Sequence, residues 1–251
     1  MPTAGFARYG PGASQVMEWL VPTGPVQQVL LVAIHGGYWR LRYGLEELRP
    51  FCAALAQRGF PVASLEYRRL GEAGGGWPGT LDDVEAALAA LPAAAADRGL
   101  HLRGALLVGH SAGGHLALWA ASRAQAPAGR TLPVLGVAGL APVSDLAEAS
   151  RLNLSSGVVR ELLGGSPEQV PARYRAASPV ELLPLRLPTV LVHGTDDADV
   201  PYALSPAYVQ RARASGDEAQ LVTLEGGGHF DVTAPDSPYW PQVLQAIESL
   251  A

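Results

Sequence analysis

The chain has 251 residues and a formal net charge of −5, with 48% apolar and 16% charged residues. This composition supports a large hydrophobic core and excludes an extensively disordered chain. The acidic balance, without a block of like charge, argues against nucleic acid or an anionic membrane as a partner, so we expect a small-molecule substrate. The chain contains no lysine, which excludes a Walker-type phosphate loop and a Schiff-base enzyme.

Cys52 is the single cysteine, so no internal disulfide can form and we expect a reducing, cytoplasmic setting. It lies in an amphipathic helical pattern, which predicts a buried structural thiol. The first twelve residues lack the basic start and apolar core of a signal peptide. The longest aliphatic run, 29–34, is too short to span a bilayer. The sequence is compatible with a homodimer and contains nothing that decides the oligomeric state.

Strand and helix patterns alternate along the chain. Apolar runs predict strands over 15–22, 27–34, 61–68, 104–109, 134–143, 188–194 and 219–226. Periodic patterns predict helices over 44–58, 80–99, 112–124, 202–216 and 238–251. In the second of these helices we expect Thr80 to be the N-cap and Pro92 to end or kink the helix. The alternation predicts one α/β domain over residues 1–251, with a mostly parallel central sheet and helices on both faces.

Residues 144–188 interrupt this alternation with short helical pieces and scattered prolines and serines. An insertion between two strands of such a sheet usually lies over the carboxyl ends of the strands, where ligands bind. We therefore expect this insertion to cover part of a site, and a plain surface excursion is the alternative.

A candidate nucleophile lies between two of the predicted elements. Residues 109–113, GHSAG, match the pattern G-x-S-x-G, and they place Ser111 between an apolar strand and a helix. The flanking glycines let strand and helix approach closely, and the helix N-terminus stabilises negative charge. The pattern predicts a nucleophilic serine, and an ordinary N-cap serine is the alternative.

A serine hydroxyl becomes a nucleophile when a base takes its proton, and in this architecture the chain order is serine, acid, histidine. His229, in the loop GGGHFD, lies beyond the candidate acids, and His193 is its rival. The acid lies in HGTDDADVP. Because loops of this form place the acid on the third residue after the glycine, we predict Asp197, with Asp196 as the alternate. We expect Asp199 to cap or brace the loop.

The segment AIHGGYW follows a predicted strand and supplies candidate oxyanion-binding groups. We expect the backbone N–H groups of Gly37 and Tyr38 to face a developing oxyanion, with Gly36 shaping the turn and Ala112 as a further donor. His35 is interpreted as a structural hydrogen-bonding residue. Two aromatic residues flank these segments and are candidate substrate contacts: Trp39 and Phe230.

Together, HGGYW, GHSAGGHLA, HGTDDADVP and GHFD resemble the α/β-hydrolase fold over nearly the whole chain. Within that superfamily they resemble the kynurenine formamidase (arylformamidase) group and its esterase neighbours. The resemblance implies an oxyanion hole in the HGG-aromatic-Trp loop, a triad of Ser111, Asp197 and His229, and no metal or other cofactor.

This resemblance implies a serine hydrolase that cleaves aryl formamides or small activated esters through an acyl-enzyme. Similar HGG-aromatic-Trp loops occur in carboxylesterases that act on acetylated or feruloylated sugars, so a general carboxylesterase of short-chain esters is the alternative. A non-catalytic relative that binds a small ligand is the third hypothesis. It is the least supported, because such proteins usually lose a triad member.

Overall fold

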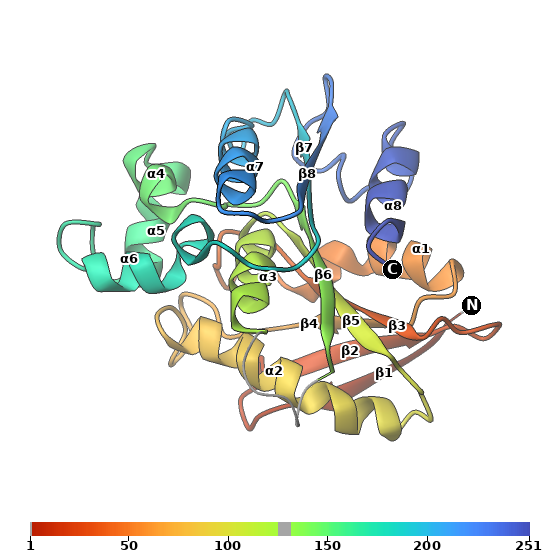
Figure 1. Cartoon of the computed structure of the whole chain (residues 1–251). Helices are drawn as coiled ribbons and strands as arrows, with labels where there is room; N and C mark the ends of the chain where they lie inside the picture. Colours follow the sequence, from red (N-terminus) through yellow and green to blue (C-terminus); the bar gives the residue numbers. More distant parts are fainter. Residues whose placement is uncertain (1, 125–131) are drawn as a thin grey trace.

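The computed structural model describes residues 2–124 and 132–251, which form a twisted sheet with helices packed on its two faces (Figure 1). The sheet has the strand order β1-β2-β4-β3-β5-β6-β7-β8. Its strands are β1 (Thr3–Arg8), β2 (Val16–Val21), β3 (Val29–Ile34), β4 (Val62–Leu65), β5 (Gly104–His110), β6 (Val134–Leu140), β7 (Thr189–Gly194) and β8 (Ala219–Leu224).

The helices follow the strands in the alternating order that the sequence predicts. They are α1 (Arg49–Gln57), α2 (Gly79–Ala96), α3 (Ala112–Arg123), α4 (Leu146–Arg151), α5 (Leu154–Leu163), α6 (Pro171–Ala177), α7 (Leu204–Ala214) and α8 (Trp240–Glu248). Two 3₁₀ turns complete the set: η1 (Leu45–Leu48) and η2 (Pro179–Leu182). The prediction of an α/β-hydrolase fold with a mostly parallel sheet is confirmed by this arrangement and by the structural comparisons reported below.

Six neighbouring strands pair in parallel: β4, β3, β5, β6, β7 and β8. At one edge, β1 and β2 are antiparallel to their neighbours. The sheet is therefore mostly parallel, as the sequence predicts, and its antiparallel edge includes β1, which was not among the predicted strands. A tight turn explains the difference, because a hydrogen bond of 3.1 Å from the Tyr9 N–H to the Gln15 carbonyl closes a hairpin. A connection this short has no room for a crossover helix.

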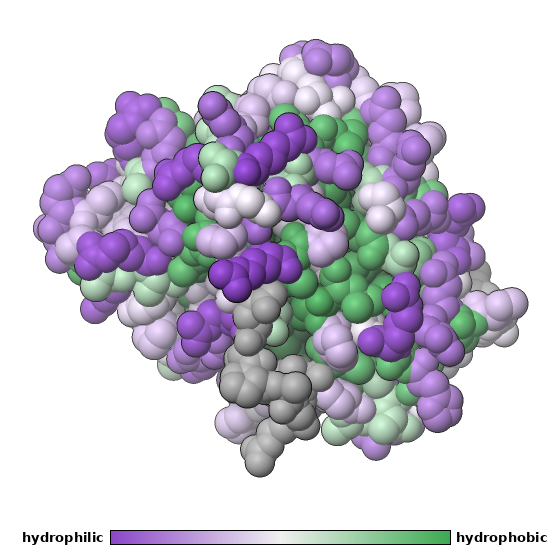
Figure 2. Space-filling model, in the orientation of Figure 1, coloured by the Kyte–Doolittle hydropathy of each residue, from purple (hydrophilic) through white to green (hydrophobic). Residues whose placement is uncertain are grey.

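Alternate residues of the central strands enter two separate cores. In β3, Leu30, Val32 and Ile34 pack toward α2 and α3, while Val29, Leu31 and Ala33 pack toward α1 and α8. Figure 1 shows α1 and α8 on one side of the sheet and α2, α3 and α7 on the other. In Figure 2 the outer sides of the helices are mostly hydrophilic, and hydrophobic residues gather between α3 and α8. Strands that bury every residue, as β3 does, are typical of a sheet covered on both faces.

Two expectations for α2 are corrected by the structure. The residue at the N-cap position is Pro78, and Thr80 instead donates its hydroxyl to the Arg68 carbonyl and accepts the Gly76 N–H at 2.9 Å. The helix also continues through Pro92 to Ala96, so the proline does not end it, and a kink at Pro92 stays a prediction. Residues on both sides of the proline, Leu91 and Ala94, are buried. Tertiary packing outweighs the local signals at both points.

Two further sequence expectations concern burial and membranes. Cys52 is fully buried in α1, and this burial raises its pKa to about 12, so the prediction of a structural thiol is confirmed. By length and hydropathy, no helix in the two described ranges could serve as a membrane span.

A buried ion pair fastens α2 to the loop that leaves β4. Asp83 is 1% exposed and accepts hydrogen bonds from the Arg68 backbone N–H at 2.9 Å and from its guanidinium at 2.6 and 2.8 Å. The Gln15 amide donates to the same carboxylate at 2.7 Å. The pair thereby joins α2, β4 and the β1–β2 turn.

We predict that Asp83→Ala lowers the free energy of unfolding by about 3 kcal/mol, because it leaves a partly buried guanidinium and a backbone N–H without an acceptor. Urea denaturation measures the change. Asp82→Ala, at the exposed neighbouring position, is the matched control and should change the unfolding free energy by less than about 0.5 kcal/mol. Equal effects of the two substitutions would contradict this account.

Candidate active site

Ser111 lies on a sharp turn between β5 and α3. Its φ is 56° and it is only 2% exposed. A Cβ at Gly109 would collide with the Gly113 carbonyl, and a Cβ at Gly113 would collide with the carbonyls of Ile34 and His35. The two glycines are therefore required by space, and the turn holds the serine in a strained, left-handed backbone conformation.

His229 and Asp197 form a direct hydrogen bond of 2.7 Å between Nδ1 and Oδ2. The Asp197 side chain is fully buried. Its Oδ1 accepts the backbone N–H groups of Asp199 and Val200, both at 2.8 Å, and its Oδ2 also lies 3.1 Å from His193 Nε2. The carboxylate is thus held on both oxygens, which fixes the direction of its bond to the imidazole.

The environment favours a charged aspartate and a neutral imidazole. Burial alone would raise the pKa of Asp197, but the hydrogen bonds from His193, His229 and the Val200 N–H outweigh it and lower that pKa far below its ordinary range. The pKa of His229 is lowered by burial and by the nearby charge of His110, against the raising effect of Asp197. His229 is therefore available as a base at neutral pH.

The residues of this cluster leave the carboxyl ends of neighbouring strands. Ser111 follows β5, Asp197 follows β7, and His229 lies in the loop after β8. The ring of His110, which precedes Ser111 in the chain, lies 4.6 Å from the His229 ring, so the histidine is beside the serine turn. In the described part of the chain the Ser111 hydroxyl makes no hydrogen bond. Such bonds are often long or poorly aligned in sites without substrate.

The loop after β3 runs directly past the serine. A Cβ on Gly36 would lie 3.0 Å from the Ser111 Cβ, so the loop backbone packs against the serine without room for a side chain. Gly37 and Tyr38 follow with φ of 92° and 54°. Within residues 2–124 and 132–251, the N–H groups of Gly37, Tyr38 and Ala112 donate to no acceptor. These free donors next to a serine are suited to binding an oxyanion.

The structure contradicts the prediction that Trp39 contacts substrate. Its φ is 55°, and its indole is fully buried and packs edge-on against His115 at 5.2 Å between ring centroids. His115 is itself buried, which lowers its pKa to about 4. Trp39 therefore supports the loop from beneath.

Phe230, by contrast, is 58% exposed beside the cluster. Its ring contacts the rings of His229 and His110 at centroid distances of 5.2 and 5.6 Å. An exposed aromatic ring next to an imidazole is open to a ligand, so the role of Phe230 as a substrate contact stays a prediction.

The two other aspartates of the acid loop make different contacts. Asp196 is exposed and accepts only from the Thr195 hydroxyl at 3.3 Å, so it does not meet His229. Asp199 braces more than its own loop, because the Tyr38 hydroxyl donates to its Oδ1 at 2.8 Å. That bond joins the loop after β3 to the loop after β7.

Sequence reasoning missed two buried glutamate–histidine pairs. His35, expected to be structural, bonds Glu66 through Nε2 at 2.8 Å and stacks on Tyr67 at 4.4 Å. His110, excluded as a base by chain order, bonds Glu47 through Nδ1. The Glu66 pair could have been suspected, because Glu66 comes near the end of a predicted strand, at the edge of the sheet where the site forms. Nothing in the sequence marks Glu47.

The insertion 144–188 folds into α4, α5, α6 and η2 and contacts two loops at the carboxyl edge of the sheet. The Arg40 guanidinium donates to the Ser155 carbonyl at 3.2 Å and pairs with Glu161 at 3.0 Å. The Trp77 N–H, in the loop after β4, donates to the Leu162 carbonyl at 2.8 Å. The insertion therefore lies against the segment that follows the free N–H groups.

Asp197, Asp199 and His229 could also be considered as metal ligands, because one ligand atom of each lies within 4.8 Å of the others. These atoms already have protein partners: His229 Nδ1 and Asp197 bond each other, and Asp199 accepts from Tyr38. The hydrogen bonds account for the cluster without an ion.

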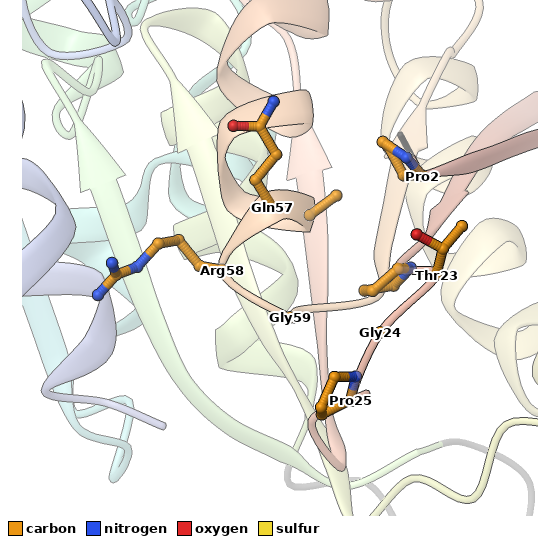
Figure 3. Close-up of a pocket in the computed structure, with 9 residues that line it drawn as sticks. Pro2, Thr23, Gly24, Pro25, Gln57, Arg58 and Gly59 are labelled. Atoms are coloured by element: carbon orange, nitrogen blue, oxygen red, sulfur yellow. The ribbon is translucent and has the colours of Figure 1, made fainter.

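A hollow of about 430 Å³ lies elsewhere, lined by the turn before β3 and the end of α1. Figure 3 shows the residues that line it. Its residues precede β3 and β4, so it opens at the amino ends of the strands, opposite to the edge that carries Ser111. Ligands of parallel α/β sheets bind at the carboxyl ends. The hollow is therefore not part of this site.

A family model for BD-FAE matches residues 20–211. The chain belongs to the BD-FAE family. The match includes the loop after β3, the Ser111 turn and Asp197, and it ends before His229.

Among characterised proteins, the chain is similar to esterase LipC of Mycobacterium tuberculosis, with 28% identity over 243 residues that cover 89% of this chain. The chain spans between about half and three-fifths of the length of the curated relatives it matches first. It also superposes on a truncated carbohydrate esterase from gut microbiota, with 21% identity, a TM-score of 0.86, and coverage of 99% and 96% of the two chains.

A third similar protein is esterase B from Lactobacillus rhamnosis inhibited by a tributyrin phosphonate, with 24% identity, a TM-score of 0.81, and coverage of 98% and 86%. These two superpositions establish the α/β-hydrolase fold of this member of the BD-FAE family.

We predict that Asp197→Asn slows the labelling of Ser111 by a fluorophosphonate by at least about a hundredfold, because an amide cannot hold the Nδ1–H tautomer of His229. The labelling rate is measured by mass spectrometry of the modified serine. Asp196→Asn is the matched control and should label within about twofold of the unmodified chain. A slower reaction for Asp196→Asn than for Asp197→Asn would reassign the acid.

Proposed function

We propose that this protein is a serine hydrolase that cleaves short-chain carboxylic esters through an acyl-enzyme. The observation that carries the proposal is the 2.7 Å bond between His229 and a fully buried Asp197, beside a strained serine turn. Ser111 is the nucleophile, His229 the general base and then acid, and Asp197 the residue that orients the imidazole.

The reaction follows from these positions. His229 takes the hydroxyl proton while Ser111 attacks the ester carbonyl, and the carbonyl oxygen becomes an oxyanion. The free N–H groups of Gly37, Tyr38 and Ala112 bind that oxygen, and α3 adds the positive end of its dipole. His229 then protonates the leaving alcohol, and water repeats the same steps on the acyl-enzyme to release the acid.

The choice of ester over formamide is supported by the comparisons. The similar proteins reported above carry the names of esterases, and one was inhibited by a phosphonate related to tributyrin. The formamidase resemblance rests on the sequence motifs alone. Both substrate classes need the same triad, so the substrate itself must discriminate between them.

We predict that Ser111→Ala lowers kcat on p-nitrophenyl acetate by at least about a thousandfold, because the acyl-enzyme can no longer form. Ser122→Ala, near the end of the same helix, is the control and should retain activity within about twofold. The unmodified protein is then assayed on p-nitrophenyl acetate, p-nitrophenyl butyrate and N-formylkynurenine, and we expect the esters to give the higher kcat/KM.

Undiminished turnover by Ser111→Ala would remove the serine from its role. A higher kcat/KM on N-formylkynurenine than on either ester would replace the ester proposal with the formamidase one. Absence of fluorophosphonate labelling together with absence of turnover would favour the non-catalytic ligand-binding relative.

We predict an acid limb of kcat/KM with a midpoint below 6.5, the ordinary pKa of histidine. Burial lowers the pKa of His229, so its neutral, basic form persists as the pH falls through the range where an exposed histidine would gain a proton. Activity therefore rises with pH up to that lowered pKa and is flat at neutral pH. A pH series of kcat/KM tests this, and a midpoint above 6.5 would contradict it.

A further inference from the structure

The pair formed by Glu47 and His110 lies beside His229. His110 ends β5 and is 1% exposed. Its Nδ1 meets the carboxylate of Glu47, which comes from η1, and its Nε2 lies 3.1 Å from the backbone carbonyl of His229. One side chain therefore links three segments that are far apart in the sequence.

The partners define which hydrogens His110 carries. A carbonyl oxygen can only accept, so Nε2 bears a proton and donates it to the His229 carbonyl. Burial would raise the pKa of Glu47, but the hydrogen bond and the charge of His110 outweigh it and lower that pKa, so Glu47 is a carboxylate. Both ring nitrogens of His110 therefore face oxygen atoms, Nδ1 that of Glu47 and Nε2 that of the His229 carbonyl.

His110 also packs against two parts of the site. Its ring contacts the ring of His229 at 4.6 Å between centroids, tilted by 41°. On its other side, a Cβ at Gly36 would lie 3.2 Å from His110 Nδ1 and 3.0 Å from the Ser111 Cβ. The same imidazole therefore packs against the loop that carries the base and against the loop of the free N–H groups.

We propose that Glu47 and His110 are positioning residues for His229, an inference that rests on the proposed function. Glu47 orients the His110 ring. His110 then fixes the His229 backbone through the hydrogen bond to the His229 carbonyl, and it packs against the His229 ring. The imidazole of His229 can then turn only within the narrow range that serves both Asp197 and Ser111. A displacement of about 1 Å in such a group can cost about a hundredfold in rate.

The pair has an electrostatic effect as well. The charge of His110 opposes protonation of His229, and the bond to Asp197 favours it. Removing His110 while the aspartates remain should therefore raise the pKa of His229. The titratable groups that act on this ring come from three other segments: Asp197 and Asp199 after β7, His110 at the end of β5, and Glu47 in η1. Asp231, in the loop of His229, bonds the Gly228 N–H and the Ser237 hydroxyl instead.

The test compares His110→Leu, Glu47→Gln and the control Glu46→Gln, which changes the exposed neighbour in the same 3₁₀ turn. We expect His110→Leu to lower kcat on p-nitrophenyl acetate by about a hundredfold with KM within about threefold. Its acid limb should also move to higher pH. Glu47→Gln should lose about tenfold or less, because the glutamine amide can replace the carboxylate as a hydrogen-bond partner of Nδ1, and the Nε2–H stays on the carbonyl. Glu46→Gln should match the unmodified protein.

A His110→Leu protein with kcat within about twofold and an unmoved acid limb overturns the inference. So does a fall in kcat that only tracks the unfolded fraction, measured by thermal melting, with no change in the pH midpoint. If His110→Leu does not fold, Glu47→Ala provides the test at a side chain that is 16% exposed. It should lose more activity than Glu47→Gln, and equal activity of the two overturns the inference.

These outcomes are separable from failure of the proposed function. Equal turnover by the unmodified protein and Ser111→Ala would reject the triad itself. The positioning role is rejected only when turnover depends on Ser111 and is indifferent to Glu47 and His110.

Discussion

The lack of space at the Ser111 turn is the constraint on which the rest of the site depends. The start of α3 presses against the ends of β3 and β5 so closely that Gly109 and Gly113 have no room for a Cβ. This contact pushes the serine out of the sheet with φ of 56° and brings the first N–H groups of α3 to its side. The strain is maintained by the packed sheet beneath, since local propensity alone would not hold such a conformation.

Around this turn, the site is held by two largely buried glutamate–histidine pairs. Glu66 with His35 supports the loop of the free N–H groups, and Glu47 with His110 supports the loop of His229. Removing a single partner from such a pair leaves an unpaired buried charge, which costs more than the pair contributes. Burial raises the pKa of Tyr67, which stays neutral and donates its hydroxyl to the His35 carbonyl at 2.9 Å.

The sequence predicted the elements that carry the site, because a buried parallel strand followed by a helix leaves a strong pattern. The strand before Ser111 and the chain order of serine, acid and histidine pointed to residues that the structure brings to one edge of the sheet. The antiparallel edge was not predicted, since β1 is short, largely exposed and lacks an apolar run. Side-chain direction was the second limit. Trp39 sits in the predicted loop, but its side chain is buried in the core, a direction that no residue pattern reveals.

The glutamates illustrate a third limit. Glu47 lies about sixty residues before its partner in the chain, and its neighbour Glu46 is equally acidic and faces solvent. Which of two adjacent glutamates turns inward depends on the phase of one 3₁₀ turn, and boundaries of short turns are the least predictable feature of a sequence.

The bond between Tyr38 and Asp199 has a consequence for attempts to alter selectivity. It ties the loop after β3, which carries the free N–H groups, to the loop after β7, which carries Asp197, so neither loop is an independent module. A substitution after β7 that displaces Asp199 would therefore also disturb the position of Tyr38 in the loop after β3. Diversification confined to the rim near Phe230, whose ring is exposed, leaves that cross-link intact.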